Sequence, residues 1–147
     1  IERGAAVSTL KHTHHAVDVD QPGKDTYEHR RAGASQVMLS SSARWALMTE
    51  LRDAPEPSVQ DLIDRMAPVD LVIVEGFKRD AHPKIEVHRP AVGKPLLLGD
   101  MPNIVAVATD DPTLSVDAPL LDLNDVAAIA QFVLERFAPT ILARAGR

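Results

Sequence analysis

The sequence has no cysteine, which excludes disulfide bonds and metal sites built from thiolates. It also has no apolar run of about 18 residues, the length that a membrane-spanning helix requires. Nothing at its start has the character of a signal peptide. We therefore expect a cytoplasmic protein that does not associate with membranes.

Positive charge and aromatic residues are scarce as well. The formal net charge is −5, which argues against non-specific binding to nucleic acid. Aromatic residues make up 3% of the chain, so the core must consist mainly of Val, Leu, Ile and Ala. A chain of 147 residues is long enough for one domain with a substantial core. We expect that domain at 1–138, followed by a tail at 139–147.

Glycine occurs only seven times, and its positions exclude a phosphate-binding loop of the pattern G-x-x-x-x-G-K-[ST]. Such a loop surrounds phosphates with backbone N–H groups and supplies a lysine and a metal-binding hydroxyl. The two Gly-Lys pairs, at Gly23 and Gly93, lack the upstream glycine of this pattern. By itself, this polypeptide is expected to bind triphosphates poorly.

The strongest positive signal is the run Leu71–Val74, which is followed by Glu75 and Gly76. A short apolar run with these boundaries predicts a strand buried on both faces, as in parallel sheets. Its carboxyl end is where α/β proteins bind ligands, and P-loop NTPases hold Mg²⁺ there with a carboxylate. The alternative is a core strand that ends in a plain turn, with Glu75 in solvent.

Strands and amphipathic helices alternate along the rest of the chain, which predicts an α/β fold with a mainly parallel sheet flanked by helices. Further strands are expected at 5–10, 84–88, 104–108 and 119–121, whereas 96–98 is either a strand or a loop. Helices are expected to end at Gly4, to run from Asp25 to about Ala32, to run from Ser58 to Met66, and to begin after an Asn124 cap. The pair Asp25 and Glu28 has the form of a capping box.

Two further strands, Gln36–Ser40 and Arg44–Thr49, are separated by serines and predict a hairpin. Neither strand alternates apolar with polar residues, so both faces of the hairpin need cover. A monomer would require another layer to cover both faces, which predicts a protruding hairpin that forms a homodimer.

Two groups of polar residues are candidate ligands. His12 and His14 lie two apart, so on a strand they share a face and can chelate a metal together with Asp18 or Asp20. We favour the alternative, in which these imidazoles line a nucleotide cleft. Asp18 and Asp20 lie on a loop where GTPases of similar fold have a mobile switch segment, and by that resemblance Asp18 or Asp20 would contact Mg²⁺ through water, with simple turn chemistry as the alternative.

Thr109 and Asp110 follow a strand and are therefore expected at the same rim of the sheet as Glu75. The family resemblance set out below implies a GTP ligand, and guanine presents two N–H donors side by side that one carboxylate accepts. Asp110 is the candidate for that carboxylate, and Asp111 competes with it. Capping of the following turn is the alternative role.

Five motifs occur in one order: Leu10–His15, Asp18–Thr26, Arg31–Ala34, Arg44–Glu50 and Val74–Lys78. Together they resemble the molybdopterin-guanine dinucleotide biosynthesis protein B (MobB) family, from Ile1 to about Phe137. The resemblance implies a P-loop NTPase-like fold that binds GTP and Mg²⁺, at most a weak GTPase activity, and a homodimer. It also implies assistance to the guanylyltransferase MobA, with a molybdopterin intermediate as a possible further partner.

On this basis we predict a site assembled from the strand ends. Lys11, His12, Gly76, Thr109 and Asp110 are predicted to contact the nucleotide, and Asp18 and Glu75 the metal, with Glu75 as the catalytic candidate. The chain departs from the family in lacking the phosphate loop, which we expect just upstream of Ile1.

Two other classes of protein are compatible with these features. A metal-chaperone GTPase would use His12, His14 and His15, although such proteins usually carry longer histidine runs or a Cys-x-x-His pair. A dimeric scaffold without nucleotide activity would account for the missing loop. A glycine-rich loop upstream would favour a GTP-binding accessory protein or a metal-chaperone GTPase over the scaffold. Metal analysis of the purified protein would then separate the accessory protein from the metal chaperone.

Overall fold

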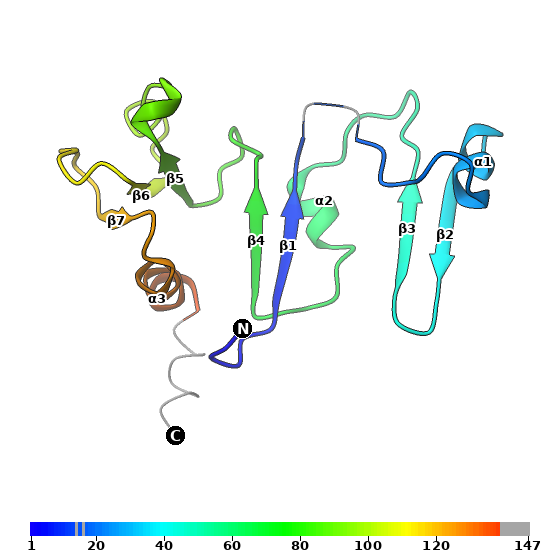
Figure 1. Ribbon diagram of the computed structural model, residues 1–147, viewed down its shortest axis with the longest axis horizontal. Helices are drawn as coiled ribbons and strands as arrows, with labels where there is room; N and C mark the ends of the chain where they lie inside the picture. The colour runs from blue at the N-terminus through cyan, green and yellow to red at the C-terminus, as the bar shows by residue number, and fades with distance from the viewer. Residues whose placement is uncertain (14, 16, 139–147) are drawn as a thin grey trace. The chain divides into compact units, whose positions relative to one another are not determined.

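The computed structural model describes residues 1–13, 15 and 17–138 (Figure 1). His14 and the predicted tail at 139–147 lie outside the described residues. The described strands are β1 (Val7–Lys11), β2 (Gln36–Ser40), β3 (Trp45–Thr49), β4 (Leu71–Glu75), β5 (Lys84–His88), β6 (Ile104–Thr109) and β7 (Leu120–Asp122). The helices are α1 (Asp25–Arg31), α2 (Val59–Ile63) and α3 (Val126–Phe137), with a short 3-10 helix at Pro90–Val92.

The chain divides into two compact units. The first contains residues 1–10 and 68–147, and the second contains residues 11–67. The sequence predicts one domain at 1–138, and this division into two units leaves that prediction as it stands.

The centre of the first unit is the parallel sheet β5-β6-β7. Its middle strand is β6, whose residues Ala106, Val107 and Ala108 are buried. Hydrogen-bonded neighbours on both edges explain this burial, and the predicted strand at 104–108 is confirmed.

Strands β1 and β4 form a separate two-stranded sheet, and their arrows point the same way in Figure 1. Asp70 leads into β4 and exchanges hydrogen bonds with Ala6, donating from its backbone N–H at 3.0 Å and accepting on Oδ2 at 2.9 Å. The bounds of β4 agree with the prediction. The prediction that both of its faces are buried was wrong, because Ile73 is 50% exposed. Within the described residues β4 pairs with β1 alone, so it is not a central strand.

The exposed face of strand β5 is the opposite of the one that its hydropathy pattern predicts. Glu86 is buried and Val87 is 67% exposed, although alternation predicts the reverse. The cause is the segment at 96–98, which is a loop: the carboxylate of Glu86 accepts backbone N–H groups from Leu97 at 2.7 Å and Leu98 at 3.0 Å. Hydrogen bonds to the charged group compensate for its burial.

The ends of the first unit differ from the prediction in two details. Residues 1–4 form a turn rather than a helix end, closed by a 2.8 Å bond from the Gly4 N–H to the Ile1 carbonyl. The side chain that caps α3 is Asp125, not Asn124, because Asp125 Oδ1 accepts the Ala128 N–H at 2.9 Å. A small buried cluster comprises Ala5, Leu134 and Ala138, with Val7 packed against it.

The second unit contains α1, α2 and the hairpin. Helix α1 has the predicted position, but the predicted Asp25–Glu28 capping box was wrong: its N-cap residue is Lys24, which makes no side-chain cap bond. Helix α2 begins where predicted, with a capping box of Ser58 and Asp61, and ends earlier than predicted, at Ile63.

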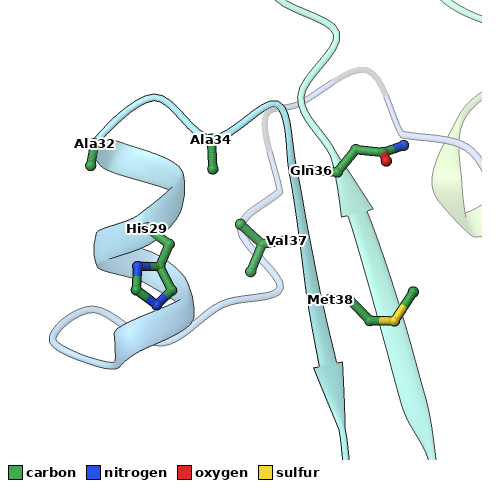
Figure 2. Close-up of a pocket in the computed structure, with 6 residues that line it drawn as sticks. All are labelled: His29, Ala32, Ala34, Gln36, Val37 and Met38. Carbon is green, nitrogen blue, oxygen red and sulfur yellow. The ribbon is translucent and has the colours of Figure 1, made fainter.

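The hairpin agrees with the prediction in both position and pairing. Strands β2 and β3 are antiparallel, with Met38 opposite Leu47 and Ser40 opposite Trp45. Val37 lies beneath α1 and is 7% exposed, whereas Trp45 is 67% exposed. Figure 2 shows Val37 on the α1 side of the strand and Met38 on the other side. Within the second unit, one face of the hairpin is thus covered in part and the other is open.

Candidate functional site

The carboxyl end of β4 has an unusual backbone. Glu75 is the last residue of the strand and is exposed, and it makes interactions with its surroundings. Gly76 follows with a φ of 93°, and Phe77 has a φ of 46°. For a bulky residue this left-handed conformation costs about 1–2 kcal/mol, and such strain concentrates at functional sites. The sequence did not reveal Phe77, because nothing in its pattern signals a positive φ.

The ends of β5 and β6 bring a second group together in the same unit. The expectation that this group shares a sheet rim with Glu75 was wrong, because β4 and β6 belong to separate sheets in the described part of the chain. Arg89, just after β5, donates from Nη1 to Asp110 Oδ2 at 2.7 Å. Thr109 is buried, and its hydroxyl oxygen accepts the Asp111 N–H at 3.1 Å. Sequence reasoning missed Arg89, which lies 21 positions from its partner.

The hydrogen bonds distinguish Asp110 from its neighbour. Asp111 Oδ1 accepts the hydroxyl of Thr113 at 2.7 Å and its backbone N–H at 2.9 Å. These bonds, the hydroxyl first, hold the pKa of Asp111 below its usual value. Asp111 thus closes its own turn, which leaves Asp110 as the better candidate for a ligand group at this rim.

The second unit carries Lys11, His12 and Asp18. Lys11 ends β1 and is exposed. His12 Nε2 lies 2.7 Å from Glu56 Oε1. The predicted chelating pair includes His14, which lies outside the described residues. Among the residues that the structure describes, no three His, Asp or Glu side chains are grouped to hold a metal.

Asp18 is held by Arg30, a residue that the sequence analysis did not select. Arg30 Nη2 lies 2.6 Å from each Asp18 carboxylate oxygen. This hydrogen bond lowers the pKa of Asp18 below its usual value, and the Asp20 N–H bonded to Asp18 Oδ1 at 3.1 Å contributes to the same effect. The Asp18–Lys24 loop is thereby fixed to α1.

These carboxylates suit Mg²⁺ better than a transition metal. Mg²⁺ usually takes one or two protein carboxylates and completes its shell with water and phosphate oxygens. Glu75, at the end of β4, is the predicted carboxylate of this kind in the first unit. One carboxylate of this kind suits an ion that arrives with a phosphate ligand.

Two shallow hollows also occur in the described part of the chain. One, of about 440 Å³, lies between α1 and β2 and is shown in Figure 2. The other, of about 570 Å³, follows the β4 turn and is lined by Lys78, Arg79, Asp80, Ala81, Asp100, Met101, Pro102 and Asn103. Neither is lined by any of the predicted site residues.

The architecture matches that of solved proteins. A crystal structure of molybdopterin-guanine biosynthesis protein B (mobB) superposes with a TM-score of 0.70, covering 91% of this chain and 82% of that chain at 23% sequence identity. The B. subtilis MobB crystal structure gives a TM-score of 0.67 at 21% identity, covering 92% of this chain and 82% of that chain. These likenesses define the class as an α/β fold of the P-loop NTPase-like kind, with mainly parallel sheets and flanking helices.

Sequence comparison then defines the family. The profile of "Molybdopterin guanine dinucleotide synthesis protein B" matches residues 1–110. The molybdopterin-guanine dinucleotide biosynthesis adapter protein of Escherichia coli (strain K12) is 48% identical over 136 residues, covering 90% of this chain and 77% of that protein. The chain belongs to the MobB family, as its five motifs indicated. No helix in the described part is long and apolar enough to cross a membrane.

Proposed function

We propose that this chain is a GTP-binding adapter of molybdenum cofactor biosynthesis that assists the nucleotidyltransferase MobA. The observation that carries this proposal is the 48% identity, across 90% of the chain, to a molybdopterin-guanine dinucleotide biosynthesis adapter protein. We place it in the cytoplasm, as a homodimer, with a molybdopterin intermediate as a further ligand.

The strand ends would hold Mg²⁺-GTP in this proposal. Asp110, oriented by Arg89, would accept the two N–H donors of guanine, with Thr109 beside it. Gly76 lets the backbone approach a phosphate closely. Glu75 would contact the metal through its water ligands. The predicted roles of Lys11, His12 and Asp18, which belong to the second unit, stay predictions.

Catalysis would be weak at most. Mg²⁺, when bound, would neutralise charge that develops on the phosphates. Glu75 would accept a hydrogen bond from a water molecule and orient it. The sequence has no glycine-rich phosphate loop, so this polypeptide alone lacks the group that cradles the triphosphate.

The test compares this chain with a form extended upstream through a phosphate loop. Calorimetry with Mg²⁺ should detect GTP binding only in the extended form, and this chain should show no turnover above background. Equal binding by both forms would mean that the phosphate site has been misplaced.

A second measurement tests the adapter role. The extended form and purified MobA should co-elute in gel filtration when Mg²⁺ and GTP are present, and elute separately if the adapter role is wrong. Metal analysis of the purified protein separates this function from a metal chaperone, which would retain a transition metal.

A further inference from the structure

Arg89 and Asp110 leave the parallel sheet side by side in the first unit. Strands β5 and β6 are parallel, with His88 opposite Thr109 at their carboxyl ends. Arg89 and Asp110 are the residues that follow directly. Arg89 has an extended backbone, with a φ of −124° and a ψ of 111°, and its carbonyl oxygen accepts the Val92 N–H at 3.0 Å. The turn after β5 therefore fixes the point from which the Arg89 side chain extends towards Asp110.

The ion pair between these two side chains leaves most of their hydrogen-bonding capacity unused. Arg89 Nη1 donates to Asp110 Oδ2 at 2.7 Å, and within the described residues neither side chain makes another hydrogen bond. The Arg89 side chain is 49% exposed and that of Asp110 is 29% exposed, so a ligand can reach both. The guanidinium keeps further N–H donors, and the carboxylate keeps its second oxygen and further lone pairs.

Stability alone accounts poorly for this pair. An ion pair with this much exposure contributes little to stability, because solvent screens it. The turn after β6 does not need Asp110 either, since Asp111 Oδ1 already accepts the hydroxyl and the N–H of Thr113. What distinguishes the pair is the set of groups that it leaves unused.

These groups form a row of acceptor, acceptor and donor. Oδ1 and Oδ2 of Asp110 are the acceptors, and Nη1 of Arg89 is a donor beside Oδ2. The edge of guanine presents the complementary row, with the N2–H and N1–H donors followed by the O6 acceptor. One hydrogen of Nη1 bonds Oδ2, and its other hydrogen is available to O6 when guanine pairs with the carboxylate. Adenine has an acceptor at N1 and a donor at N6, so it opposes the row at both positions.

We propose that Arg89 is a specificity-determining residue that bonds O6 of guanine while Asp110 accepts N1–H and N2–H. The inference rests on the proposed function, in which Asp110 accepts the guanine donors. It gives Arg89 a contact with the base in addition to its contact with Asp110. A charged donor makes a stronger hydrogen bond to a carbonyl oxygen than a neutral donor does. The pair thus favours guanine over adenine through both of its side chains.

The test compares GTP with 6-thio-GTP, in which sulfur, a weak acceptor, replaces O6 and both N–H donors remain. In the upstream-extended protein at pH 7, calorimetry with Mg²⁺ should show about tenfold weaker binding of 6-thio-GTP than of GTP. Arg89→Met keeps an unbranched side chain without a donor. This variant should bind GTP about tenfold more weakly than the wild type and should bind the two nucleotides equally.

A second probe and a matched variant separate Arg89 from Asp110. Inosine triphosphate keeps O6 and N1–H but lacks the 2-amino group. The wild type and Arg89→Met should both bind it more weakly than GTP, because the missing contact belongs to Asp110. Arg136, an exposed arginine of α3 in the same unit, provides the control. Arg136→Met removes the same charge and should leave all three affinities unchanged.

The outcomes distinguish this inference from the proposed function. If the wild type binds GTP and 6-thio-GTP equally but inosine triphosphate more weakly, the role of Arg89 is wrong and the proposed function stands. The same conclusion follows if Arg89→Met keeps the full preference for GTP over 6-thio-GTP. If the wild type binds GTP and inosine triphosphate equally, Asp110 does not accept the 2-amino group, and the proposed base site is wrong together with this inference. No GTP binding by the extended wild type overturns both.

Discussion

At the scale of single residues, the carboxylates of this protein differ mainly in which neighbours donate hydrogen bonds to them. Asp111 accepts from Thr113 and closes its own turn, whereas Asp110 accepts from Arg89 at the rim of the parallel sheet. Asp110 and Asp111 are adjacent in sequence, but their side chains bond to different partners. This difference leads to a prediction about base recognition.

In the upstream-extended protein, Asp110→Asn should weaken GTP binding at least about thirtyfold. The new amide presents a donor to the N1–H and N2–H donors of guanine, which costs about 2–4 kcal/mol. Xanthine has a carbonyl where guanine has its amino group, so xanthosine triphosphate should bind better relative to GTP. Affinities for both nucleotides are measured with Mg²⁺ present.

The control for this substitution is Asp111→Asn. It should alter the turn at Thr113 and leave the preference for guanine in place. A change of preference in Asp111→Asn alone would move the base contact by one residue, and no change in either variant would place base recognition elsewhere.

A second residue-scale prediction concerns pH. Burial, and then the charge of Lys84, lower the pKa of His82 below its usual value of 6.5. As pH falls through about 6.5, the unfolded chain binds a proton that the folded chain does not, so stability decreases towards the folded pKa. His82→Gln should flatten this decrease in urea unfolding between about pH 7.5 and 5.5. Parallel curves for wild type and variant would contradict the prediction.

At the scale of elements, local hydrogen bonds explain where helix α2 begins. Helix α2 has only five residues, and its capping box is complete: Ser58 Oγ accepts the Asp61 N–H at 3.2 Å, and Asp61 Oδ2 accepts the Ser58 N–H at 3.0 Å. The hydrogen bond from the Ser58 hydroxyl also lowers the pKa of Asp61. A helix this short depends on its cap, because few internal bonds compensate for nucleation.

Ser58→Ala should therefore lower the free energy of unfolding by about 1 kcal/mol, because it removes the side-chain acceptor of the cap. Urea unfolding followed by circular dichroism measures this change. Ser42→Ala, at an exposed position between β2 and β3, is the matched control and should have little effect. Equal stabilities of the two variants would mean that the cap contributes nothing measurable.

At the scale of the whole molecule, the hairpin has an apolar face that the rest of the second unit leaves open. Trp45, Leu47 and Met38 are 67%, 43% and 60% exposed, and the pairing register places them together on one face. An apolar face on a regular hairpin is suited to a second copy, because two-fold dimers bury the same surface on both partners.

We therefore predict that light scattering at micromolar concentration gives twice the chain mass of 16.0 kDa. Trp45→Glu should give the monomer mass, because it places a charge in the apolar contact. Ser42→Glu adds the same charge in the turn and should remain dimeric. A monomeric wild type would contradict the hairpin interface.

The sequence by itself determined what depends on neighbouring residues. Hydrophobic period and turn residues predicted the strands around 71–75 and 104–108 and the β2–β3 hairpin, because strand formation and hairpin register follow local patterns. Five motifs in order were sufficient to indicate the MobB family. The positions of Glu75, Thr109 and Asp110 at or just after strand ends were likewise predictable, since strand ends are recognisable in sequence.

Only the tertiary structure decided what depends on residues far apart in the chain. Glu86 is buried because a loop more than ten positions away supplies its donors, and this reverses the exposed face of β5. Arg30 and Arg89 are important because the chain path brings carboxylates to them, and neither has a sequence signal of its own. Periodicity records which residues repeat along an element, but the partner of a charged side chain is fixed by packing between elements.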